Sequence, residues 1–132
     1  MNEPMKALIV DDSRAIRLML RRILTASGFD VAEARHGREA LTHLETHADT
    51  AIALVDWNMP EMNGLELVKA IRADDRLAAL RVMMVTTETE VAHIERALAA
   101  GANEYVMKPF SREIIEEKLR LLGVDGDGLR AS

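Results

Sequence analysis

Polar and charged residues directly follow four of the short apolar runs in this sequence. Asp11 and Asp12 follow the first run, Asp56 the third, Thr86 the fourth and Lys108 the fifth. If the fold brings these ends together, three carboxylates share one site, and two unit charges about 4 Å apart repel by about 4 kcal/mol at an effective dielectric near 20. A bound cation would relieve that repulsion. Oxygen ligands without histidine or cysteine favour a hard ion, and a small number of protein ligands favours Mg²⁺ over Ca²⁺.

Asp56 is the carboxylate that we expect to act as a nucleophile. It stands alone at the end of its run, ahead of residues 57–60, a segment that can fold over an incoming group. A metal ion that neutralises the oxygens of a phosphoryl group lets a carboxylate approach the phosphorus. Lys108 would bring a positive point charge and Thr86 a hydroxyl to the same oxygens. These residues therefore predict Mg²⁺-dependent transfer of a phosphoryl group to Asp56.

The apolar periodicity of the chain predicts the elements that must bring these side chains together. Short apolar runs alternate with segments whose apolar residues recur every three or four positions, which is typical of parallel strands joined by crossover helices. The predicted strands are residues 7–10, 31–34, 51–55, 82–85 and 105–107, and the helical stripes are residues 16–24, 41–44, 67–71, 91–98 and 115–122. Runs that are apolar at nearly every position suit strands covered on both faces.

The predicted fold class is therefore α/β, a (βα)₅ doubly wound three-layer sandwich with a five-stranded parallel sheet. Ligands of such sheets bind at the carboxyl ends of the strands, where the candidate residues stand. Gly28 and Gly101 follow predicted helices as left-handed caps do. Two pairs have the spacing of a capping box, Asn63 with Glu66 and Thr87 with Glu90.

Size and composition fit one domain. The chain has 132 residues, of which 48% are hydrophobic, and its periodicity stops at residue 122, so we expect a domain over residues 1–122 and a flexible tail over residues 123–132. The four histidines, at positions 36, 43, 47 and 93, fall outside the strand ends, and we expect them to be surface residues.

Charge and cysteine content exclude several classes of function. A formal net charge of −5 argues against a nucleic-acid partner, because binding to phosphate backbones needs clustered lysine and arginine. The chain has no cysteine, so it forms neither disulfides nor thiolate metal sites, as suits a reducing compartment. No apolar run approaches the ~18 residues of a membrane span. We expect no membrane insertion and a cytoplasmic location.

The same residues carry a resemblance to a known family. The sequence resembles the response-regulator receiver family over residues 5–122, because five separated elements occur in the family's order at the predicted strand ends. These elements are Asp11-Asp12, Asp56, the Met59-Pro60 and Gly64 that follow it, Thr86, and Lys108-Pro109-Phe110. Within the family, residues 56–60 with residues 64–67, and Tyr105 before Lys108, are most similar to the chemotaxis regulators. The resemblance implies a flavodoxin-like strand order of 2-1-3-4-5.

The resemblance also implies a mechanism. A histidine kinase would phosphorylate Asp56, and Asp12, Asp56 and the backbone carbonyl of Asn58 would bind Mg²⁺ directly, with Asp11 helping through water. The bond between Lys108 and Pro109 would be cis.

The signal would pass through two further residues. Thr86 would move toward the phosphoryl group, and the ring of Tyr105 would move into the space that Thr86 leaves. The face formed by the fourth helix, fifth strand and fifth helix would then bind a downstream protein, with the receiver as a monomer.

Several functions remain open at this point. We expect a stand-alone signalling switch, in chemotaxis, that catalyses only its own phosphorylation and dephosphorylation. A phosphorelay shuttle, or a receiver excised from a longer regulator, is the alternative within the family. A phosphatase of the haloacid-dehalogenase type also uses an aspartate nucleophile with Mg²⁺, but it needs a second aspartate where this chain has Asn58. A receiver that binds partners without phosphorylation is a further alternative, disfavoured by the complete set of site residues.

Overall fold

The computed structural model describes residues 3–88 and 91–124. In chain order the elements are β1 (Lys6–Val10), α1 (Arg14–Ala26), β2 (Asp30–Ala34), α2 (Gly37–Thr46), β3 (Ile52–Val55), α3 (Gly64–Arg72), a 3₁₀ turn (Asp75–Leu77), β4 (Arg81–Thr86), α4 (Val91–Ala100), β5 (Glu104–Met107) and α5 (Arg112–Leu121). Each strand begins and ends within one residue of its predicted bounds, and each helical stripe falls within a helix except for Leu122, which directly follows α5. Within the described ranges, no helix has the length and apolar character of a membrane span.

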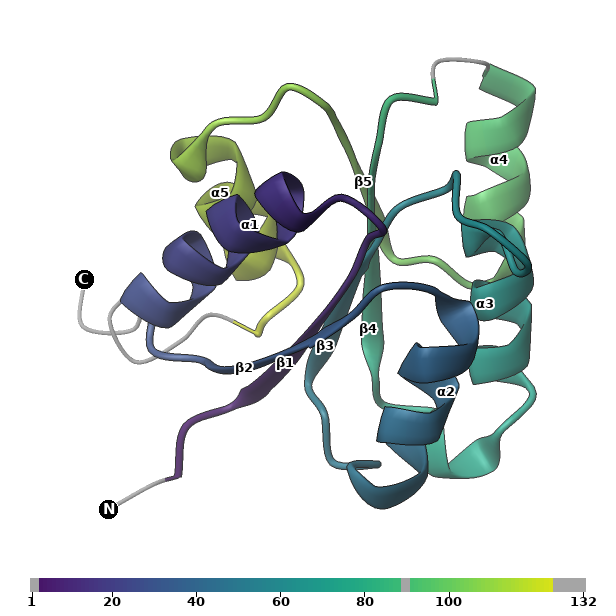
Figure 1. Ribbon diagram of the computed structural model, residues 1–132, viewed down its shortest axis with the longest axis horizontal. Coiled ribbons are helices and arrows are strands. Elements are labelled where there is room, and N and C mark those ends of the chain that lie inside the picture. Colours follow the sequence, from purple (N-terminus) through teal and green to yellow (C-terminus); the bar gives the residue numbers. More distant parts are fainter. Residues whose placement is uncertain (1–2, 89–90, 125–132) are drawn as a thin grey trace.

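The five strands form one parallel sheet in the order β2-β1-β3-β4-β5. Helices α1 and α5 cover one face, and α2, α3 and α4 cover the other (Figure 1). The predicted fold class and strand order are therefore confirmed. Because all strands run in the same direction, their carboxyl ends lie along one edge of the sheet.

Alternating side chains of the central strands separate the core into two parts. In β1, Leu8 and Val10 pack on the side of α2 and α3, whereas Ala7 and Ile9 pack on the side of α1 and α5. All four are at most 1% exposed, as expected of a strand covered on both faces. Val124 also packs into the α1 side, so the core continues two residues beyond the predicted boundary at residue 122. The rest of the predicted tail, residues 125–132, lies outside the described residues.

The predicted helix ends agree with the backbone geometry. Gly28 and Gly101 have φ values of +94° and +121°, in the left-handed region that glycine adopts readily. Asn63 and Glu66 form the capping box: each side chain accepts a backbone N–H from the other at 2.9 Å. The second predicted box includes Glu90, which lies outside the described residues.

Arg72, at the end of α3, holds together the loops at the amino edge of the sheet. Its guanidinium donates to four acceptors, the carbonyls of Gly101, Leu77 and Leu80 and the side-chain oxygen of Asn103, at 2.7–3.2 Å. These acceptors precede β4 and β5, so one side chain fixes where both strands begin. Nothing in the sequence pattern pointed to this role.

Replacing Arg72 with methionine should lower the free energy of unfolding by about 2–3 kcal/mol. The change keeps an apolar stem of similar length but removes the side-chain donor of the Gly101 and Leu80 carbonyls, while the Leu77 carbonyl keeps the Leu80 N–H. Urea unfolding followed by circular dichroism measures the loss. Arg38→Met, at an exposed position of α2, is the control and should change stability by less than about 0.5 kcal/mol. Equal losses in the two variants would contradict the role of Arg72.

Candidate functional site

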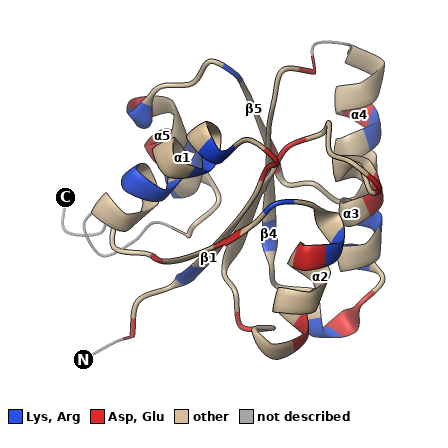
Figure 2. Cartoon of the chain, in the orientation of Figure 1, with Lys and Arg blue, Asp and Glu red and all other residues tan. Residues whose placement is uncertain are grey.

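The parallel sheet places the candidate residues at its carboxyl edge. Backbone hydrogen bonds continue past the strands: the Asp56 N–H donates to the Val10 carbonyl at 3.0 Å, and the Lys108 N–H donates to the Thr86 carbonyl at 2.9 Å. Asp56 therefore lies beside the end of β1, and Lys108 beside the end of β4. Figure 2 shows acidic segments meeting at this edge, near the centre of the view.

Three carboxylates gather at this point. One oxygen from each of Asp11, Asp12 and Asp56 lies within 4.8 Å of the others. Asp11 and Asp56 are 2% and 6% exposed, whereas Asp12 faces solvent. The structure thus brings together the three side chains that the sequence assigned to one site, with two of them shielded from water.

Lys108 supplies the positive charge nearest to the buried pair. Its Nζ lies 2.8 Å from Oδ2 of Asp11 and 3.6 Å from Oδ2 of Asp56. The peptide bond from Lys108 to Pro109 is cis, as expected. The other oxygen of Asp11 accepts the Ser13 N–H at 2.8 Å, so both oxygens of Asp11 have partners.

The surroundings of Asp56 destabilise the ionised form of its carboxylate. Burial raises the pKa of Asp56 above its ordinary value, and the charge of Asp11 raises it further. Lys108, the Thr86 hydroxyl and the Trp57 backbone act in the opposite direction without cancelling the rise in pKa. A divalent cation would favour the ionised form, so this all-oxygen donor set fits a hard ion such as Mg²⁺. Asn58 lies two residues beyond Asp56 with an exposed side chain, and the role of its carbonyl stays a prediction.

Comparison with known proteins agrees with this geometry. The family model described as "Response regulator receiver domain" matches residues 7–120. The chain belongs to the response-regulator receiver family. Receiver domains bind Mg²⁺ at an acidic pocket of this kind, and a histidine kinase and a downstream target are the partners that membership implies.

Several relatives match this receiver over nearly their whole length. It is 47% identical to chemotaxis protein CheY1 of Helicobacter pylori strain J99 over 119 residues, covering 89% of this chain and 96% of that one. It is 46% identical to a chemotaxis protein CheY homolog of Campylobacter jejuni over 125 residues, covering 94% and 96%. Among solved structures, chemotaxis response regulator CheY4 of Vibrio cholerae has a TM-score of 0.83 at 36% identity, covering 89% and 98%.

Thr86 and Tyr105, the predicted switch residues, meet at the backbone of Glu88. The buried Thr86 hydroxyl accepts the Glu88 N–H at 3.2 Å, and the half-buried Tyr105 hydroxyl donates to the Glu88 carbonyl. Burial raises the pKa of Tyr105, and the charges of Glu88 and Asp56 add to the rise. In this receiver the two residues are therefore joined through one peptide segment, a link that their sequence positions did not indicate.

All four histidines lie at the surface with partly buried side chains, and His93 makes a contact that the sequence did not indicate. Its imidazole is half-buried and stacks on the ring of Trp57, with ring centroids 5.2 Å apart. His93 comes from α4, and Trp57 directly follows Asp56. The sequence could not indicate this contact, because 36 positions separate the two residues.

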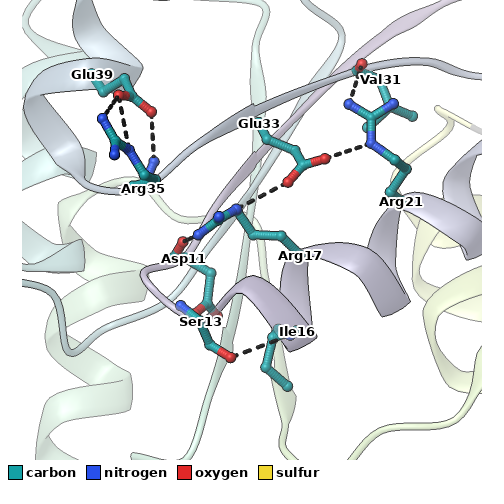
Figure 3. A network of polar contacts seen from close by, with 9 residues as sticks. All are labelled: Asp11, Ser13, Ile16, Arg17, Arg21, Val31, Glu33, Arg35 and Glu39. Atoms are coloured by element: carbon teal, nitrogen blue, oxygen red, sulfur yellow. Dashed lines mark hydrogen bonds and ion pairs between the residues drawn. The ribbon is translucent and has the colours of Figure 1, made fainter.

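A polar network behind the site was also missed. Arg17 donates to the backbone carbonyl of Asp11 at 2.8 Å and to the Glu33 carboxylate at 2.9 Å, and Arg21 donates to the other oxygen of Glu33 (Figure 3). The arginines belong to α1 and Glu33 to β2. The i, i+4 spacing of Arg17 and Arg21 predicts that both lie on one face of a helix. That this face meets Glu33 follows only from the packing of α1 beside β2.

Gly64 lets α3 approach the backbone of Asp56 and Trp57. Its N–H donates to the Trp57 carbonyl at 2.8 Å, and a Cβ here would lie 2.4 Å from the Asp56 carbonyl oxygen and 2.9 Å from the Trp57 Cα. Both neighbours are backbone atoms, which cannot rotate away. Any larger residue would displace either α3 or Asp56.

Gly64→Ala should lower the free energy of unfolding by about 1–3 kcal/mol, because the added methyl group must push backbone apart. Gly37→Ala is a matched control, since Gly37 also begins a helix but its Cβ would meet the flexible side chain of Met62. That control should change stability by less than about 1 kcal/mol. Urea unfolding of both variants provides the comparison, and a Gly64 variant as stable as the control would refute the steric argument.

Glu33→Gln should cost about 1 kcal/mol at neutral pH, because the carboxylate is about 29% exposed and is held by two arginines. Burial raises the pKa of Glu33, but hydrogen bonds from Arg21 and Arg17 outweigh it and hold the pKa below its ordinary value of 4.5. A lowered folded pKa gives stability that is present above pH 4.5 and is lost as pH falls through the folded value.

The measurement is urea unfolding of parent and Glu33→Gln between acid and neutral pH. The two curves should converge as the solution becomes more acidic than pH 4.5. Glu117→Gln, at an exposed position of α5, should follow the parent throughout. A difference between parent and Glu33→Gln that stays constant through the acid range would show that the charge of Glu33 is not its cause.

Proposed function

We propose that this receiver accepts a phosphoryl group from a histidine kinase on Asp56, in a Mg²⁺-dependent reaction, and signals through protein contacts. The observation that supports it most strongly is the position of the Lys108 ammonium beside the carboxylates of both Asp11 and Asp56. An ammonium that serves two buried carboxylates is also placed to meet a phosphoryl oxygen on Asp56.

In the proposed reaction an Asp56 carboxylate oxygen forms a bond to phosphorus while the phosphorus–nitrogen bond of a kinase phosphohistidine breaks. The leaving imidazole keeps the electron pair of that bond and takes up a proton. Lys108 and the Thr86 hydroxyl bind the phosphoryl oxygens, and Asp12, Asp56 and the Asn58 carbonyl would hold Mg²⁺, with Asp11 acting through water. When bound, Mg²⁺ neutralises negative charge on the transferred group.

The proposed output runs from Thr86 and Tyr105 to the face formed by α4, β5 and α5. Exposed apolar side chains on this face suit a protein partner: Val91 and Leu98 of α4 are 66% and 44% exposed, and Met107 of β5 is 42% exposed. The phosphorylated and resting states would differ in affinity for that partner, typically by about 1–3 kcal/mol.

The pathway that we propose is chemotaxis, because the relatives from Helicobacter pylori and Campylobacter jejuni are named chemotaxis proteins. We propose a monomeric stand-alone switch in the cytoplasm that catalyses only its own phosphorylation and dephosphorylation. Receivers also occur in longer proteins: the chain matches about half of a response regulator/GGDEF domain structure at a TM-score of 0.85 and 31% identity. Transfer of the phosphoryl group onward to a purified histidine phosphotransfer protein would instead support a shuttle.

Acetyl phosphate with Mg²⁺ should add one phosphoryl group to the parent protein and none to Asp56→Asn, as measured by intact mass spectrometry. The amide of asparagine is not a nucleophile toward phosphorus, so the bond cannot form. Asp75→Asn, at an exposed position distant in sequence from the site, is the matched control and should be phosphorylated like the parent. Phosphorylation of Asp56→Asn at the parental rate would refute the proposed acceptor.

Lys108→Ala should slow the same reaction by about 10²-fold or more, because it removes a charge aimed at the transferred group. Lys69→Ala, an exposed lysine of α3, should leave the rate within about twofold of the parent, since isolated surface charges contribute little. Rates come from the time course of the phosphorylated mass. An unchanged rate in Lys108→Ala would remove Lys108 from the reaction while leaving Asp56 as the acceptor.

A further inference from the structure

The ring of Trp57 joins the phospho-acceptor loop to helix α4. Trp57 lies between Asp56 and Asn58 in the chain and is 7% exposed. Its indole stacks on the imidazole of His93, in the first turn of α4, with an interplanar angle of 13°. Aromatic pairs in this geometry stabilise beyond the area that they bury. The position of this loop and the position of α4 are therefore physically connected.

The carboxylate of Glu88 lies against the imidazole of His93. Nδ1 of His93 lies 3.1 Å from Oε2 of Glu88. The backbone of Glu88 is itself bound to Thr86 through its N–H and to Tyr105 through its carbonyl. A continuous series of contacts thus runs from Trp57 through His93 and Glu88 to both proposed switch residues.

We propose that His93 is a positioning residue that fixes the loop of Asp56 and Asn58 against α4. The geometry with which this loop presents oxygen ligands to a divalent ion then depends on where α4 lies. The dependence is reciprocal, so a change at Asp56 reaches α4 through the ring contact as well as through Thr86 and Tyr105. The inference rests on the proposed function where it concerns Mg²⁺, and on the ring contact alone where it concerns the loop.

Trp57 is the only tryptophan of the chain, so its fluorescence and its indole N–H signal report on this loop alone. Three variants separate positioning from a general structural role. His93→Ala removes the ring contact and the contact with Glu88, whereas His93→Phe keeps an aromatic ring on Trp57. Ala99→Gly, at an exposed position of α4, weakens the helix without touching the ring contact.

The first measurement uses metal-free protein and acrylamide quenching of Trp57 fluorescence. His93→Ala should make Trp57 clearly more accessible to the quencher, by about twofold, because one face of the indole loses its cover. His93→Phe and Ala99→Gly should both stay close to the parent. Unchanged quenching in His93→Ala, or an equal rise in Ala99→Gly, would overturn the proposal.

The second measurement is a Mg²⁺ titration followed by the NMR signal of the Trp57 indole N–H. His93→Ala should bind Mg²⁺ about threefold to tenfold more weakly than the parent, with His93→Phe restoring the affinity and Ala99→Gly leaving it unchanged. Equal Mg²⁺ affinity in parent and His93→Ala would overturn the link to the metal ligands. A parent that does not respond to Mg²⁺ would contradict the proposed function instead, while the quenching data still decide whether His93 holds the loop.

Discussion

Three carboxylates gather within 4.8 Å of one another, and the ammonium group of Lys108 lies beside the two that are buried. Two of the carboxylates, Asp11 and Asp56, are almost fully buried, and the pKa of Asp56 is raised, first by burial and then by Asp11. Such an arrangement favours any additional positive charge that can enter. The site therefore favours binding of a divalent ion. The proposed transfer of a phosphoryl group to a carboxylate would depend on such an ion.

The parallel sheet is what makes this crowding possible. The ladder of backbone hydrogen bonds continues one residue beyond the strands. It holds Asp56 beside the end of β1 and Lys108 beside the end of β4. The surrounding structure then fixes the backbone behind the carboxylates, since Arg17 binds the Asp11 carbonyl and Gly64 lets α3 approach the carbonyl of Asp56. Electrostatic repulsion within the site is thus opposed by backbone hydrogen bonds and close packing around the carboxylates.

Coupling of the site to the rest of the molecule runs over short distances. Thr86 and Tyr105 share the backbone of Glu88, whose side chain lies against His93, and His93 stacks on the residue next to Asp56. The loop after β3 that begins with Asp56, the segment after β4 and the first turn of α4 therefore form one contact network. A network of this kind carries a signal only if its members have two arrangements with different affinity for phosphate or partner.

The sequence by itself determined the five strands, the helical stripes and the residues that stand at the strand ends. It could do so because apolar periodicity and cap residues are local, and because parallel strands bring their carboxyl ends to one edge whatever the details of packing. Only the tertiary structure decided three side-chain contacts. They are the hydrogen bonds of Arg72 to the loops before β4 and β5, the binding of Glu33 by Arg17 and Arg21, and the stacking of His93 on Trp57. Each contact joins side chains from different elements. Their directions depend on how the helices pack against the sheet, and the periodicity of the sequence does not indicate that packing.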